Sequence, residues 1–179
     1  MEQNEIKFVL DSETEKVRVM GFPELAGREG RYMGDGMAMF WGEEWRNYEL
    51  FIANIKTCKI RKLSTEDGSM LVDDREIDFE LIEKKCRYGY DNARNKCIRY
   101  GALNRYDGFE NGISAISWVI YPEGRYFEDS DGFGGEDNDE EVIYAIMDTN
   151  LDIIEPFRPV DDIRRYLREL RAERKGSVK

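Results

Sequence analysis

Eight carboxylates lie within the 14 residues from 128 to 141, together with three glycines and no lysine or arginine. Hard cations such as Ca²⁺ bind several oxygen ligands on a flexible backbone, so this composition can supply a metal site. The spacing does not match an EF-hand, because aligning Gly132 with the required glycine leaves Asn138 where the final Glu should be. The candidate metal ligands are Asp129, Asp131, Asp137 and Asp139.

The same carboxylates can instead form a surface for a positively charged partner. The window from Glu123 to Asp162 holds 14 acidic and two basic residues, a net charge of −12, while the whole chain carries −11. Such a concentration of charge steers association with basic proteins and repels acidic ones. A solvated loop without a partner is the alternative. The candidate partner-binding residues are Glu128, Asp129, Asp131, Glu136, Asp137, Asp139, Glu140 and Glu141.

The chain contains no histidine. This excludes Ser-His-Asp and Cys-His catalysis, histidine-ligated metals and imidazole acid/base chemistry within the chain. Its three cysteines, Cys58, Cys86 and Cys97, form neither a CxxC pair nor a disulfide framework. We therefore expect packing residues rather than nucleophiles, and a reducing cytoplasmic location.

A basic segment runs from residue 84 to residue 105, with seven lysines and arginines against one aspartate. Tyr88, Tyr90 and Tyr100 interleave with these bases, a mixture typical of single-stranded nucleic-acid surfaces. A protein with a pI of about 4.7 repels nucleic acid at long range. We therefore favour a basic helix face that neutralises acids elsewhere in the fold, and expect no nucleic-acid partner.

Two further patterns could do chemistry. The stretch from Gly34 to Met39 resembles half of a dinucleotide fingerprint, but it lacks the third glycine and a preceding strand. Carboxylate pairs can hydrolyse glycosidic bonds, yet no spacing among the 38 acids singles out a pair. We expect no organic cofactor.

These residues are positioned by what we expect to be one globular domain over residues 1–179, of the α+β class. The sequence predicts an antiparallel sheet or meander, one or two packed central helices and a C-terminal amphipathic helix. The glycine-rich stretch 27–42 reads as an irregular loop, with Asp35-Gly36 as a turn. The predicted strands cover 6–10, 16–20, 48–57, 113–121, 142–148 and 151–156, with helical spacing over 79–100 and 161–175.

The leading hypothesis is a non-enzymatic cytoplasmic acidic binding protein, of the inhibitor or immunity type, that engages a basic protein partner. A carboxylate-based enzyme that binds Mg²⁺, Mn²⁺ or Ca²⁺ is the alternative. A structural or scaffold subunit is the third, contacting its partners through the aromatic stretch 37–41 or the closing helix. The longest apolar run, 113–121, is about half as long as a membrane helix requires, so no membrane partner is expected.

Overall fold

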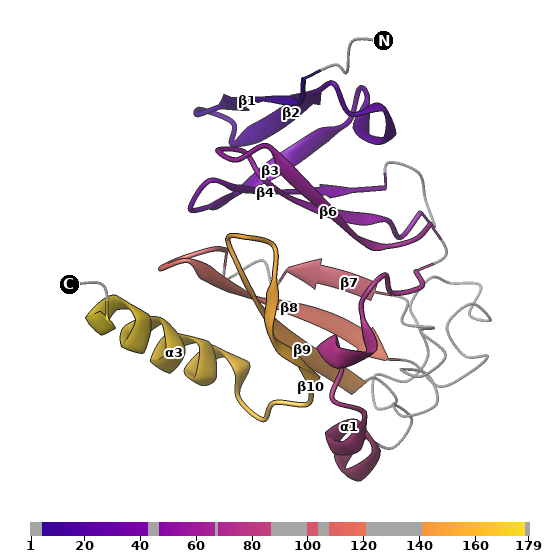
Figure 1. Ribbon diagram of the computed structural model, residues 1–179, viewed down its shortest axis with the longest axis vertical. Helices are drawn as coiled ribbons and strands as arrows, with labels where there is room; N and C mark the ends of the chain where they lie inside the picture. The colour runs from indigo at the N-terminus through magenta and orange to yellow at the C-terminus, as the bar shows by residue number, and fades with distance from the viewer. Residues whose placement is uncertain are drawn as a thin grey trace.

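The computed structural model describes residues 5–42, 47–66, 68–86, 100–103, 108–120 and 141–177. These ranges form two antiparallel sheets and two α-helices, which confirms the α+β class (Figure 1). The first sheet is a meander in chain order: β1 (Lys7–Asp11), β2 (Lys16–Met20), β3 (Glu29–Gly34), β4 (Met37–Trp41), β5 (Leu50–Asn54) and β6 (Lys59–Ser64). The second has the order β10 (Ile153–Arg158), β9 (Glu141–Asp148), β8 (Ile113–Ile120), β7 (Tyr100–Leu103). The helices are α1 (Phe79–Lys85) and α3 (Ile163–Ser177).

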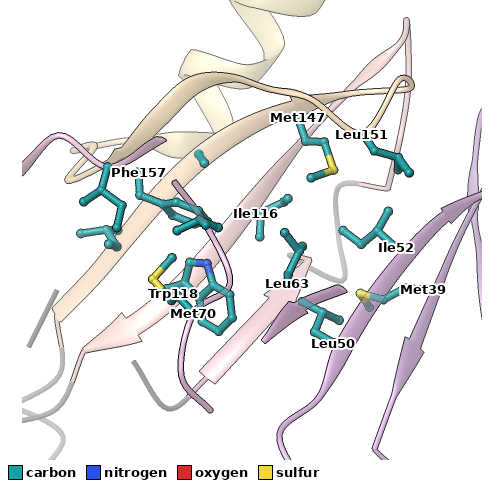
Figure 2. Packing of buried hydrophobic residues seen from close by; sticks show 14 of the residues in the cluster. Met39, Leu50, Ile52, Leu63, Met70, Ile116, Trp118, Met147, Leu151 and Phe157 are labelled. Atoms are coloured by element: carbon teal, nitrogen blue, oxygen red, sulfur yellow. The ribbon is translucent and has the colours of Figure 1, made fainter. Parts of the chain in front are cut away.

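The two sheets pack face to face through one hydrophobic core (Figure 2). Alternate residues of β4 and β5, such as Met39 and Ile52, point towards the second sheet, which contributes Ile116, Trp118 and Phe157. All five are at most 2% exposed. This alternation follows from the two-residue period of a strand, which places every second side chain on one face.

The opposite face of β4 and β5 is covered by the start of the same sheet. Phe8 on β1 and Phe40 on β4 have ring centroids 6.5 Å apart. These strands are three places apart in the sheet, a separation of about 14 Å if the sheet were flat. The sheet therefore curls, and its first strands bury a second core that includes Val17 and Leu25.

The C-terminal helix covers the outer face of the second sheet, which lies between α3 and the first sheet in Figure 1. Ile163 and Leu167 of α3 pack against residues of β8 and β9, including Ile146. The backbone N–H of Arg165 donates to the Asp162 carboxylate at 3.1 Å, which caps the first turn. The helix predicted over 161–175 is thus confirmed, with both ends two residues later.

The glycine-rich stretch 27–42 corrects the sequence analysis. It forms the hairpin of β3 and β4 rather than an irregular loop. Asp35 and Gly36 have φ values of 50° and 76°, so the expected turn is present and has the left-handed backbone that glycine favours. Gly30 on β3 is needed for space, because a Cβ there would lie 2.6 Å from the Phe40 ring.

The helical spacing predicted over 79–100 is confirmed only at its start. Asp78 accepts a hydrogen bond from the Leu81 N–H and begins α1, which ends at Lys85. Tyr100 lies in β7 and not in a helix. Residues 87–99 lie outside the described part of the chain. Strand β6 was not anticipated, whereas the hairpin of β1 and β2 and strands β5, β8, β9 and β10 match their predicted positions.

Strand β1 forms one edge of the first sheet. It pairs with β2, and no other described strand lies beside it. Val9 and Leu10 on this strand are 53% and 38% exposed. Lys7 and Asp11 occupy its two ends.

Candidate functional site

The acidic segment, residues 128–141, is attached to the hairpin of β8 and β9. Glu141 is the first residue of β9 and pairs with Ile120, the last residue of β8. The two residues that flank the connection 121–140 are therefore cross-strand neighbours at one end of the second sheet. The other seven candidate partner-binding residues, and the metal candidates Asp129, Asp131, Asp137 and Asp139, lie outside the described residues.

Three other acids of the window 123–162 have local structural partners. The Asp148 carboxylate accepts hydrogen bonds from the N–H groups of Asn150 and Asp152, at 2.9 and 3.1 Å, and so closes the turn between β9 and β10. Asp162 caps α3, and Glu155 is hydrogen-bonded on the sheet. These three acids are used within the fold, and the densest group of the remaining carboxylates lies in residues 128–141.

A carboxylate, a guanidinium and a phenol meet where β10 faces α3. Tyr166 donates its hydroxyl proton to Glu155, and Arg158 Nη2 donates to Glu155 at 3.1 Å and to the Tyr166 oxygen at 3.0 Å. Burial, followed by the hydrogen bond to Glu155, raises the pKa of Tyr166. The phenol therefore keeps its proton at neutral pH and is no general base. The cluster fastens the helix to the sheet.

A cavity of about 690 Å³ lies between α3 and the turn before β8. We call it the basic groove. Arg171 is the most buried of its cations, with a side chain 11% exposed. It donates to the Gly108 and Ile113 carbonyls and forms an ion pair with Glu110 at 3.8 Å. The groove is lined by Glu110, Asn111, Arg164, Arg168, Arg171, Ala172 and Lys175.

The sequence showed part of this site. The sequence predicted an amphipathic helix at the C-terminus, and its apolar side packs on the second sheet. The groove also needs the turn at Glu110 and Asn111, which lies more than 50 residues away along the chain. No sequence pattern indicates that this turn meets the helix. The one indication in the sequence was the spacing of Arg164, Arg168, Arg171 and Lys175, which places four cations on one side of a helix.

The described cysteines do not form a reactive site. Cys86 follows α1 and packs against the main core. Burial, and then the nearby charge of Glu141, raises the pKa of its thiol to about 11, so the thiolate is scarce at neutral pH. Cys58 is half-buried in the turn between β5 and β6. Cys97 lies outside the described residues.

Three other patterns can be compared with the structure. Gly34 and Gly36 belong to a β-hairpin, whereas a dinucleotide fingerprint requires a turn from strand to helix. In the stretch 37–41 proposed as a scaffold contact, Met37, Met39 and Phe40 are core residues, whereas Trp41 is 39% exposed. Among the described residues, no group of three acids or cysteines is placed to hold a metal ion.

No described helix is long and apolar enough to cross a membrane. Most of the basic segment 84–105 lies outside the described residues. At its start, Lys84 pairs with Glu80 on α1 at 3.6 Å, an ion pair within one helix.

Comparisons of the chain with protein-family models, with curated proteins and with solved structures find no match.

Proposed function

We propose that the protein is a non-enzymatic cytoplasmic binding protein of the inhibitor or immunity type, which engages a basic protein partner through its acidic segment. The observation that carries the proposal is the density of charge: eight carboxylates and no base within residues 128–141. Clustered carboxylates accelerate encounter with a basic surface and repel acidic proteins.

The attachment of the segment supports this proposal. Its last residue, Glu141, begins β9, and the connection that contains the segment follows Ile120 at the end of β8. These eight-residue strands pair in register over their whole length. The inner face of this hairpin is buried in the main core and its outer face is covered by α3. The acidic segment is thereby joined to a rigid part of the fold.

The test replaces Asp129, Asp131, Asp137 and Asp139 by Asn and measures capture of cytoplasmic proteins on the immobilised protein. We expect the wild type to retain a basic protein, and the variant to bind that protein at least about tenfold more weakly with an unchanged melting temperature. Added salt should weaken the wild-type complex, because exposed charges are screened. The matched control replaces four exposed acids elsewhere, Glu13, Glu83, Asp161 and Glu173, by their amides.

If the two variants lose binding equally, the net charge of the protein explains the effect, and a specific role of residues 128–141 is contradicted. If the immobilised protein captures no basic protein, or if added salt does not weaken the complex, the proposal as a whole is contradicted. Calorimetric titration with Mg²⁺, Mn²⁺ and Ca²⁺ tests the alternative of a carboxylate metal enzyme, which requires binding that the same four Asn substitutions abolish.

A further inference from the structure

We propose that the basic groove is a second binding site, and that its ligand is an acidic peptide segment of a partner protein. The proposal concerns a different surface from the acidic segment and a ligand of the opposite charge. It therefore goes beyond the function proposed above.

Four cations share one side of α3. Arg164, Arg168, Arg171 and Lys175 follow one another at intervals of three or four residues, which places their side chains in one row. The row spans about 16 Å of helix, because each residue adds about 1.5 Å. One anion cannot reach all four charges, whereas about five residues of an extended peptide cover that length.

The groove is held in shape by hydrogen bonds between its two walls. Asn111 Nδ2 donates to the Arg171 carbonyl at 3.2 Å, and Arg174 Nε donates to the Asn111 carbonyl at 3.1 Å. The N–H of Gly112 donates to the Asp35 carboxylate at 2.8 Å, which ties the same turn to the β3–β4 hairpin. Arg171 is fixed by the Gly108 and Ile113 carbonyls. A preformed site loses less entropy when a ligand binds.

The lining residues favour a peptide carboxylate as the ligand. Arg164 and Arg168 are exposed arginines, and a planar guanidinium group can bind a carboxylate through two parallel hydrogen bonds. Arg171, which already donates to the Gly108 and Ile113 carbonyls, adds positive charge at the base of the groove. Exposed Arg168 and Lys175 have no ion pair with the described residues. Among the described residues of the lining, Glu110 is the one acid, so these residues together carry a net positive charge.

Nucleic acid fits the same surface less well. Proteins that bind single strands combine cations with aromatic rings on which the bases stack. None of the described residues that line the groove is aromatic. A long nucleic acid also carries much more negative charge than a short acidic peptide, so the chain's net charge of −11 repels it more strongly at long range.

The test measures fluorescence anisotropy with a labelled peptide of about ten glutamates and with a labelled oligothymidylate of similar charge. The variant Arg168→Gln with Lys175→Gln removes two groove charges. The matched control, Arg165→Gln with Lys59→Gln, removes two exposed charges outside the groove. In the control, Arg165 loses an exposed ion pair with Glu169, which contributes little to stability.

We expect the full-length protein to bind the glutamate peptide in preference to oligothymidylate. The groove variant should raise the Kd for the peptide by about tenfold, whereas the control should change it by less than about twofold. Absence of peptide binding at low salt would overturn the proposal. Tighter binding of oligothymidylate would replace it with a nucleic-acid surface, and an equal effect of the two variants would reduce it to non-specific charge.

Discussion

The carboxylate of Glu49 is kept in its charged form by two neighbouring cations. Its side chain is 14% exposed and lies beside the first sheet, where Arg28 Nη1 donates to it at 2.9 Å and Lys62 Nζ lies 3.6 Å away. Burial by itself raises the pKa of this carboxyl. The hydrogen bond from Arg28 and the charges of Lys62 and Arg28 outweigh burial and hold the pKa of Glu49 below its ordinary value of 4.5. A buried carboxylate with two cations is thus stable in its charged form.

Glu49 should make folding stability depend on pH. Because its pKa is lower in the folded than in the unfolded chain, its contribution is present above about pH 4.5 and is lost as the pH falls through the folded value. We expect Glu49→Gln to lower the free energy of unfolding by about 1.5 kcal/mol at pH 7, with a smaller deficit at pH 3. Urea unfolding at several pH values measures this.

Arg28→Gln supplies the complementary variant. It removes the main hydrogen-bond donor to Glu49, so the acid dependence should weaken as well. If Glu49→Gln keeps the full wild-type loss of stability between neutral and acid pH, the role assigned to this carboxylate is wrong.

At the scale of elements, two glycines let the backbones of the two sheets meet. The Phe109 N–H donates to the Met33 carbonyl, which joins the end of β3 to the segment before β8. A Cβ on Gly34 would lie 2.4 Å from the Phe109 carbonyl oxygen, and a Cβ on Gly108 would lie 2.4 Å from that of Met33. Neither position has room for a side chain.

Alanine at two different glycines should separate crowding from backbone strain. Gly108→Ala meets the Met33 carbonyl, and we expect a loss of about 2 kcal/mol of stability. Gly27 has a φ of 76° with no atom near its would-be Cβ, so Gly27→Ala should cost about 1 kcal/mol. Chemical denaturation ranks the two. A Gly108→Ala variant as stable as wild type would show that the two backbones can move apart.

The elements differ in how well the sequence predicts them. Strands β8 and β9 are recognisable as apolar runs, because both of their faces are buried, and helix α3 has an apolar stripe where it packs on the second sheet. The β3–β4 hairpin was not recognisable, because Gly30 makes space for Phe40, while glycines usually indicate loops. Tyr100 continued the helical spacing yet lies in β7, since strand pairing with Val119 decides its conformation. The basic groove could not be predicted, because the sequence does not show that the turn at Glu110 and Asn111 packs on α3.

At the scale of the whole molecule, the two sheets are joined by polar contacts as well as by their core. Asn54 Nδ2 on β5 donates to the Thr149 carbonyl, and Arg61 Nη1 on β6 donates to the Leu151 carbonyl, both at 2.8 Å. Arg61 also forms an ion pair with Glu76 at 2.8 Å. Strands β5 and β6 of the first sheet thus both bind the turn between β9 and β10. We therefore expect the two sheets to unfold together.

The same substitution at two isoleucines tests this expectation. Ile52 on β5 is fully buried between the sheets, so Ile52→Ala should cost about 3 kcal/mol. Amide hydrogen exchange should accelerate in β9 as well as in β5, because both belong to one cooperative unit. Ile154 on β10 is 43% exposed, and Ile154→Ala should cost less than about 1 kcal/mol. Unchanged exchange in β9 of the Ile52→Ala protein would indicate that the sheets unfold independently.

The outer edge of β1 has a consequence for how the protein behaves in concentrated solution. An edge strand offers unpaired peptide groups to a neighbouring molecule, and Val9 and Leu10 add an apolar surface there. At neutral pH the charge of −11 keeps molecules apart by mutual repulsion. Near the isoelectric point of about 4.7 this repulsion vanishes, so aggregation should begin by strand pairing at β1 while the rest of the fold is intact.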